Sequence, residues 1–279
     1  MADSFSTTSL RAAFRYPFHS PEGMSRFLVG VALLLLSLFV PILPAIFVYG
    51  YVLQVMRRII EGEPPALPEW KNWGRLGMDG LRGLVATAVY LGPGLVVLFG
   101  GWLLFMILYL SGFNLLSNVR DALSSGIAVM LIFGAAGILF LSLFAGLCLL
   151  LVGGVPLPVA LAHMAAREKL GAAFSVFEWG AILAADRWGY FISWVMVVGL
   201  ASVIQFGVAL VYFTIILIAV AYVVILPLSF YLLLVAAAVF AQVYREGAAR
   251  LAATTPATSS AALADAEAQL SAPDTTESI

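Results

Sequence analysis

The sequence predicts an all-α, polytopic helical membrane protein, and two observations lead to this fold class. Four stretches, residues 27–56, 83–119, 122–166 and 188–244, contain no Asp, Glu, Lys or Arg. Hydrophobic residues make up 63% of the chain and charged residues only 10%, whereas soluble domains average about 25% charged residues. A helix needs roughly 20 apolar residues to cross the hydrocarbon core of a bilayer, and an ionised group at its centre costs several kcal/mol. Each uncharged stretch is therefore long enough to span a membrane.

Four full spans are expected from the last three stretches. The stretch at 122–166 is broken by Gly153-Gly154 and Pro156-x-Pro158, and a short extension then ends near Lys169. The stretch at 188–244 is too long for one crossing and predicts two helices with a turn near residues 214–220. A polar loop at residues 111–125 should reach water. The four predicted spans are residues 84–110, 126–151, 190–213 and 221–244.

The first stretch allows two interpretations, because Pro41 and Pro44 lie at its midpoint. It forms either a fifth, kinked span or a re-entrant hairpin of two half-helices that enters and leaves on one side. With the hairpin, 13 of the 14 Lys and Arg residues lie on one side and only Arg120 on the other. Positive residues concentrate on the cytoplasmic side, so this distribution favours the hairpin, with both termini cytoplasmic.

Amphipathic segments on the cytoplasmic side are expected between the spans. Residues 70–84 place Trp70 and Trp73 on one helical face and basic residues on the other, and residues 168–187 follow a similar pattern. Their aromatic and basic side chains are the candidate contacts with lipid headgroups: Arg57, Arg58, Trp70, Trp73, Arg75, Trp179 and Trp188.

These features divide the chain into three parts. Residues 1–26 interleave aromatic and basic residues and predict an N-terminal interfacial arm. Residues 27–250 form a single helical membrane domain. Residues 251–279 are rich in Ala, Ser and Thr, carry acidic residues and predict a disordered tail. Residues 1–26 contain no apolar segment typical of a cleavable signal peptide, so we expect the hydrophobic segments to direct insertion.

Several short motifs resemble one family of prokaryotic multi-pass membrane proteins. The motifs are Phe14-Arg15-Tyr16-Pro17-Phe18, Gly50-Tyr51 before Arg57-Arg58, Leu67-Pro68-Glu69-Trp70 and Asp79-Gly80-Leu81. This pattern is similar to domain-of-unknown-function family 4013, over about residues 10–250. The resemblance implies a location in a prokaryotic cell membrane. It implies no activity, ligand or catalytic residue.

The sequence offers few groups for chemistry at membrane depth. The predicted spans contain no ionisable carboxylate or amine, and proton or ion coupling is usually built from such groups. Gln205 is the most notable polar residue there, and it predicts either a helix–helix hydrogen bond or a substrate contact. His19 and His163 lack companions at metal-ligand spacing, and Cys148 has no second thiol. We therefore expect no catalytic residue, no metal and no cofactor.

A cluster of charges near residues 57–82 also has two interpretations. Glu61, Glu63, Glu69 and Asp79 lie in sequence among five basic residues. The cluster predicts either a mutually paired, solvated face or a site for a lipid headgroup or a partner's loop.

Three functions remain open at this point. The first is a non-catalytic accessory, scaffold or lipid-interacting component, with membrane lipids and other membrane subunits or further copies of the chain as partners. The second is a transporter for an apolar or amphipathic solute, which is favoured by proline-broken segments near residues 41–44 and 153–158. A lipid-modifying enzyme would need a site built from Glu69, Asp79, Glu178 and Asp186, and nothing in the sequence fixes their geometry. No basic run suggests a nucleic-acid partner.

Overall fold

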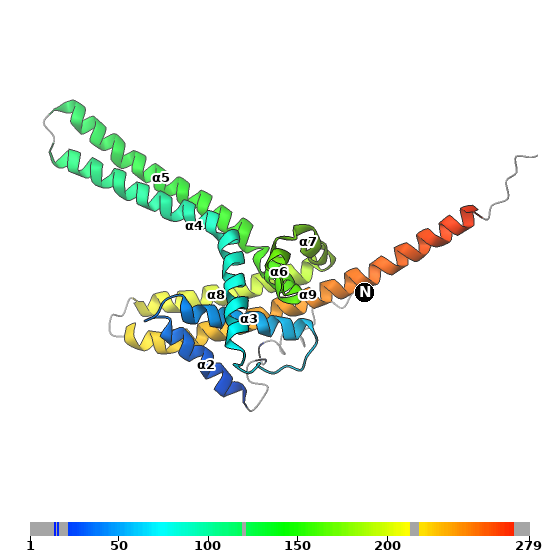
Figure 1. Ribbon diagram of the computed structural model, residues 1–279. Coiled ribbons are helices and arrows are strands. Elements are labelled where there is room, and N and C mark those ends of the chain that lie inside the picture. Colours follow the sequence, from blue (N-terminus) through cyan, green and yellow to red (C-terminus); the bar gives the residue numbers. More distant parts are fainter. Residues whose placement is uncertain (1–13, 15, 17–21, 119–120, 213–217, 271–279) are drawn as a thin grey trace, which may run out of the picture.

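The computed structural model describes residues 14, 16, 22–118, 121–212 and 218–270, and these residues are almost entirely helical (Figure 1). Within these described residues, five helical segments are long and apolar enough to cross a membrane. They are Leu43–Ile60, Trp73–Ser117, Leu123–Arg167, Arg187–Leu210 and Val224–Thr254. The predicted fold class, an all-α polytopic membrane protein, is therefore confirmed.

The first uncharged stretch forms two helices with a break between them. Helix α2 (Gly23–Leu36) ends before Pro41, and α3 (Leu43–Ile60) begins with Pro44 in its first turn. The residue before α3, Ile42, has a φ of 77°, a conformation that few L residues adopt. The prolines thus interrupt the chain where the sequence predicted, and α2 and α3 pack against each other.

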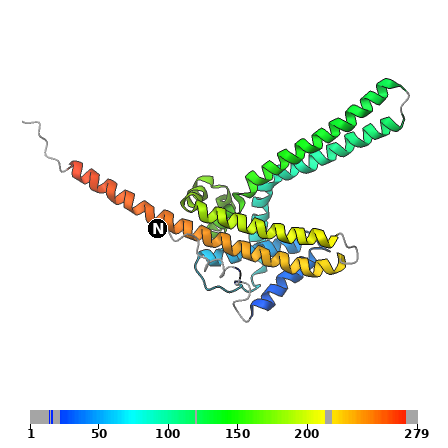
Figure 2. The same cartoon turned by 180° about the vertical axis from the view of Figure 1, so that it is seen from behind.

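Helices α4 (Trp73–Ser117) and α5 (Ala122–Gly154) form a long antiparallel hairpin that projects from the rest of the molecule (Figure 1). Helix α4 bends part-way along its length, and its internal proline, Pro93, explains the bend. Before the bend, α4 runs across the direction of α8 and α9 (Figure 2).

Two predictions from the sequence differ from the structure of this hairpin. Residues from Trp73 onward are not a separate amphipathic helix, because they run without interruption into the following span. The expected polar loop at 111–125 is also shorter, because α4 continues to Ser117 and α5 starts at Ala122. Asp121 begins α5 with a capping box, in which its carboxylate accepts a hydrogen bond from the Ser124 amide at 2.7 Å.

The break after α5 also lies where the sequence predicted. Pro156 precedes the short helix α6 (Leu157–Arg167), which ends at Glu168 in the left-handed conformation, with a φ of 56°. A 3₁₀ turn, η2 (Leu170–Phe174), and helix α7 (Val176–Ala185) then lead into α8 (Arg187–Tyr212).

Helices α8 and α9 (Ile218–Leu270) lie side by side, and α9 extends well beyond the rest of the molecule (Figures 1 and 2). The expected turn near 214–220 falls largely on residues 213–217, outside the described residues. The backbone also differs from the disorder expected after residue 250, because α9 continues through Leu270. Alanine, the strongest helix former, is frequent here and extends a helix that is already nucleated. Residues 271–279 lie outside the described part.

Helices α3 and α9 form the inside of the molecule, whereas α4 and α8 are mostly exposed. In the most apolar 18-residue segment of each helix, 56% of the residues are buried in α3 and 44% in α9, against 6% in α4 and 6% in α8. The core includes Tyr51, Phe230, Leu234 and Val239, all fully buried. The outer helices expose large apolar side chains, whose contact with water would carry a high free-energy cost.

Of the predicted N-terminal interfacial arm, residues 14, 16 and 22–26 are described. The Tyr16 side chain is buried, and its hydroxyl donates a hydrogen bond to the Ala66 carbonyl at 3.1 Å. The Phe14 carbonyl accepts one from the Tyr231 hydroxyl at 3.0 Å. These two aromatic residues therefore contact the helical body, and residues 1–13, 15 and 17–21 of the arm lie outside the described part.

Candidate functional site

A polar cleft of about 520 Å³ lies between the end of α3, the connection from residue 61 to 72, and the first turns of α4. We call it the charged cleft. It is lined by Gln54, Arg57, Arg58, Glu61, Glu63, Pro68, Glu69, Lys71, Asn72, Arg75, Leu76, Asp79 and Glu168.

A close helix crossing places α4 beside α3 at the wall of this cleft. A Cβ atom on Gly50 would lie 1.9 Å from the Leu76 carbonyl oxygen, and one on Gly80 would lie 1.9 Å from the Ile46 carbonyl oxygen. Only glycine allows the two backbones to approach so closely. The crossing brings Asp79 of α4 against Arg57 of α3.

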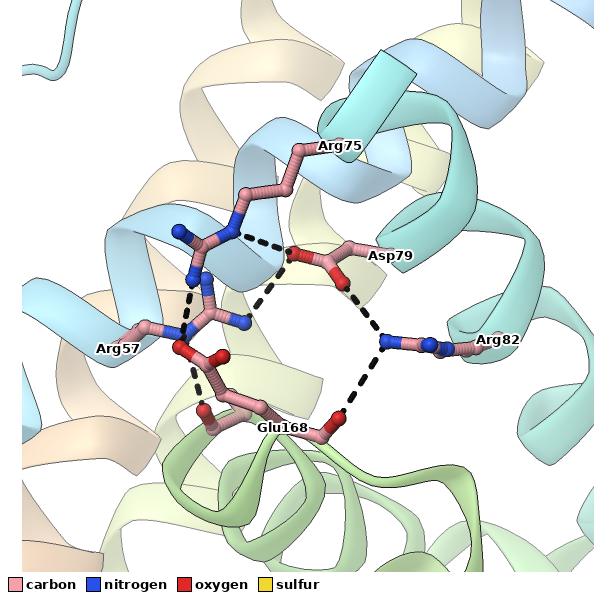
Figure 3. A network of polar contacts seen from close by, with 6 residues as sticks. Arg57, Arg75, Asp79, Arg82 and Glu168 are labelled. Carbon is pink, nitrogen blue, oxygen red and sulfur yellow. Dashed lines mark hydrogen bonds and ion pairs between the residues drawn. The ribbon is translucent and has the colours of Figure 1, made fainter. Parts of the chain in front are cut away.

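Arg57 and Asp79 form a buried ion pair at the centre of a network (Figure 3). The Arg57 Nη2 lies 3.1 Å from Asp79 Oδ2, and the two side chains are only 9% and 10% exposed. Arg57 Nε also donates to the Ala165 carbonyl of α6 at 3.1 Å. Because both charges are removed from water, their pairing and hydrogen bonds must offset a large desolvation cost.

Three further residues complete the network (Figure 3). Arg75 and Arg82, on the same helix as Asp79, lie 3.8 Å and 3.4 Å from its carboxylate oxygens. The Glu168 carboxylate lies 2.5 Å from Arg75 and 3.1 Å from Arg57. Its carbonyl oxygen accepts a hydrogen bond from Arg82 at 3.3 Å. The network therefore joins α3, α4 and the end of α6.

The connection between α3 and α4 is held in place by aromatic contacts. Trp70 stacks on Tyr51, with ring centroids 3.9 Å apart and planes 3° from parallel. The Tyr51 hydroxyl donates to the Pro68 carbonyl at 2.8 Å, and Trp70 Nε1 donates to the Arg26 carbonyl at 2.8 Å. The Glu69 carboxylate pairs with Lys71, and this hydrogen bond lowers the pKa of Glu69 below its usual range.

The cleft carries both signs of charge in nearly equal number, and most of these charges are paired across it. Arg58 pairs with Glu63, and Lys71 pairs with Glu69. The Gln54 Oε1 atom is buried and has no hydrogen-bond partner in the described part of the chain. Such a surface can bind a ligand that has both donors and acceptors. Within the described residues, no group of three or more His, Cys, Asp or Glu side chains could hold a metal ion.

The structure brings five of the predicted lipid-contact residues together around the charged cleft. Arg57, Arg58 and Arg75 line it, and Trp70 lies beside it. Trp73 is exposed and stacks on Trp70, with ring centroids 5.8 Å apart. The expected face of paired charges is present. The prediction that this face is solvated is wrong for Arg57 and Asp79, because the close helix crossing buries this pair.

The other three candidates lie elsewhere. Trp179 is buried: its ring packs into the core, and its Nε1 donates a hydrogen bond to the Ala173 carbonyl at 3.2 Å. Trp188 on α8 is exposed. Gln205 is exposed on α8 and does not line the charged cleft. Sequence periodicity missed Glu168 as part of the cleft, because Glu168 follows α6, which only the fold brings to α3 and α4. It also missed Gln54, which lies one turn before Arg57 on α3.

A second polar cluster connects α6, α7 and α9. The His163 ring is buried, with Nδ1 2.7 Å from the Tyr244 hydroxyl and Nε2 3.2 Å from the Glu178 carboxylate. Arg167 lies 3.6 Å from the same carboxylate. These contacts hold the three helices together.

One protein family matches the part of the chain that forms the charged cleft. The family model described as "Protein of unknown function (DUF4013)" matches residues 33–213, nearly two thirds of the chain. The match contains α3, α4 and Glu168, and so the whole charged cleft, but it leaves out the motif at residues 14–18. No curated protein and no solved structure shows significant similarity to the chain. The chain belongs to the DUF4013 family, as its sequence motifs predicted.

Proposed function

We propose that this protein is a non-catalytic, lipid-interacting component of a prokaryotic cell membrane, acting as an accessory or scaffold for other membrane subunits or for further copies of itself. One observation carries the proposal. The polar and charged groups gather at one end of the helical body, while α4, α5 and α8 present apolar side chains outward. A protein built this way offers its partners a lipid-facing surface and one charged surface.

The proposed topology follows from the same distribution of charge. Arg57, Glu168, Asp186 and Arg250 belong to the charged end, and Arg245 donates a hydrogen bond to the Ile59 carbonyl at the end of α3. We place this end at the cytoplasmic face, following the positive-inside rule. The C-terminus then lies in the cytoplasm, and α2 with α3 forms a re-entrant hairpin that keeps the N-terminus there as well. The first turns of α4 lie at the interface.

Thiol labelling tests this topology. Cys148, the only cysteine in the chain, is replaced by serine, and single cysteines are introduced at Ser6, Ser259 and Asp121. In intact cells, a membrane-impermeant maleimide should label only the cysteine at position 121, which lies at the tip of the α4–α5 hairpin. Labelling at position 6 as well would show that residues 27–56 cross the membrane.

A transporter for an apolar or amphipathic solute is the second candidate. Both proline-broken segments lead into short inner helices, α3 and α6, and these two helices contact each other. Broken helices at corresponding positions are typical of transport sites. Against this candidate, Gln205 is exposed on α8 and does not line the charged cleft.

Distance measurements between spin labels separate the two candidates. Labels at Phe39, in the break between α2 and α3, and at Phe206 on α8 both replace exposed side chains. In lipid nanodiscs, an accessory protein should give a single distance distribution. Two populations that exchange would favour alternating access and contradict the proposal.

A further inference from the structure

An apolar groove of about 360 Å³ lies beside the bend in α4, away from the charged cleft. We call it the Pro93 groove. Residues of α4, α5, η2 and α7 line it: Val89, Tyr90, Pro93, Leu149, Val152, Gly153, Phe174 and Val176.

Local packing explains why the groove exists and why it is apolar. Gly153 lets α5 touch α4, since a Cβ atom there would lie 1.9 Å from the Tyr90 carbonyl oxygen. The Tyr90 and Phe174 rings stack, with centroids 6.0 Å apart and planes 7° from parallel. The Tyr90 hydroxyl donates to the Ala173 carbonyl at 2.8 Å, so this polar group is satisfied within the protein. The surface that lines the groove is therefore apolar.

Two basic residues precede the parts of the chain that line the groove: Arg82 lies on α4 before Val89, and Lys169 lies directly before η2. Arg82 precedes Val89 by seven residues on α4, a rise of about 10 Å, and its guanidinium contacts the Glu168 carbonyl. The next residue, Lys169, is exposed and has no ion pair among the described residues. The Glu168 carboxylate is directed away, toward Arg57 and Arg75 (Figure 3).

Within the network around Asp79, taken together with Lys169, basic residues outnumber acidic ones, and this favours an anion. Asp79 and Glu168 are shared among Arg57, Arg75 and Arg82, and Lys169 adds a further positive charge. An apolar groove next to an excess of positive charge complements a molecule with an acyl chain and an anionic phosphate.

We propose that the Pro93 groove binds one acyl chain of an anionic phospholipid, and that the lipid phosphate lies against Arg82 and Lys169. This inference rests on the proposed lipid-facing function and names a specific lipid site within it. Neither Arg82 nor Lys169 lines the charged cleft, and the two linings share no residue, so each site can be changed without replacing a residue that lines the other.

Photo-crosslinking of the full chain tests the site. The protein is placed in phosphatidylcholine nanodiscs that contain a small fraction of phosphatidylglycerol with a diazirine on its acyl chain. Adducts are mapped by mass spectrometry. We expect labelling to be enriched at residues 89–93 and 149–153 relative to α8. The same diazirine on phosphatidylcholine should label the outer helices without this enrichment.

Variants with matched controls test both halves of the site. Val152 and Val203 are both about 70% exposed, at 73% and 70%, so Val152→Trp should fill the groove and remove the enrichment while Val203→Trp on α8 should not. Val89→Trp is a second filling variant. Lys169→Gln should weaken the enrichment about fivefold, as expected for one basic residue near an anionic lipid, and Lys71→Gln in the charged cleft should leave it unchanged.

The outcomes separate this inference from the proposed function. Uniform labelling of the outer helices by both lipids, or enrichment that survives Val152→Trp, Val89→Trp or Lys169→Gln, would overturn the groove site and leave the lipid-facing function intact. Absence of labelling on α5 and α8 would overturn both.

Discussion

Gly50 of α3 and Gly80 of α4 meet where the two helices cross, and each lies against the backbone of the other helix. A Cβ atom on Gly80 would be 2.9 Å from the Gly50 amide nitrogen, and one on Gly50 would be 3.1 Å from the Gly80 amide nitrogen. This contact determines how near Asp79 comes to Arg57, and so it determines the wall of the charged cleft.

Substitution of either glycine should therefore destabilise the protein. Gly50→Ala and Gly80→Ala should lower the thermal unfolding temperature in detergent, because the added methyl group collides with a carbonyl oxygen of the other helix. Gly92→Ala and Gly100→Ala are matched controls, since a Cβ atom at either position meets no atom within 4 Å. These controls should be neutral or stabilising by up to about 1 kcal/mol, the helix propensity of alanine over glycine. Equal effects at all four positions would contradict the close crossing.

The buried ion pair makes a second prediction. Asp79→Asn should lower the free energy of unfolding by about 3 kcal/mol, because Arg57 remains buried with only the half-exposed Glu168 to pair with it. Glu63→Gln, which breaks the more exposed pair with Arg58, should cost less than about 1 kcal/mol. Unfolding by SDS in mixed micelles measures both values. A similar cost for the two variants would mean that Arg57 and Asp79 are solvated.

The N-terminal cap of α5 makes the stability of the folded protein depend on pH. Hydrogen bonds from the Ser124 amide and side chain hold the pKa of Asp121 below its usual range. The pKa of Asp121 is lower in the folded state than in the unfolded state. Its ionised carboxylate therefore stabilises the folded protein at pH values above the pKa of the unfolded state. This stabilisation is lost as the pH falls through the folded pKa.

Thermal unfolding at neutral and acidic pH measures this effect. Asp121→Asn should keep a capping acceptor but lose part of the dependence of unfolding temperature on pH. Asp121→Ala should lose the cap as well and have a lower unfolding temperature at neutral pH. A wild-type dependence on pH in Asp121→Asn would show that other carboxylates account for the acid sensitivity.

The contact between His163 and Tyr244 makes a fourth prediction. Tyr244→Phe should cost about 1–3 kcal/mol, because it leaves the Nδ1 atom of a buried imidazole without its partner. Tyr109→Phe, at an exposed ring on the outer part of α4, is the control and should have little effect. SDS unfolding again provides the measurement. No cost at Tyr244 would contradict a role for this hydrogen bond in joining α6 to α9.

The membrane class and the helix breaks could be predicted from sequence because they depend on local properties. Long uncharged stretches lower the free energy of the chain in hydrocarbon, and Pro41, Pro44 and Pro156 interrupt helices wherever the rest of the fold places them. The motifs around Gly50, Arg57 and Asp79 likewise indicated the family, because each motif consists of residues that are close together in the chain.

The faces of the helices could not be predicted in the same way. Periodicity placed Trp179 at the lipid interface and Asp79 on a solvated face, yet both are buried against other helices. An amphipathic pattern shows that a helix has two environments, but in a membrane protein an apolar face can contact lipid or protein equally well.

The sequence by itself determined that this chain enters a membrane, where its helices break and which family it belongs to, because solvation and backbone chemistry act residue by residue. Only the tertiary structure decided that Glu168 joins Arg57, Arg75, Asp79 and Arg82, and that Phe174 helps to line a groove beside Pro93. These contacts join residues that are far apart in the chain, and they form only once glycine-mediated crossings have fixed the distances between helices.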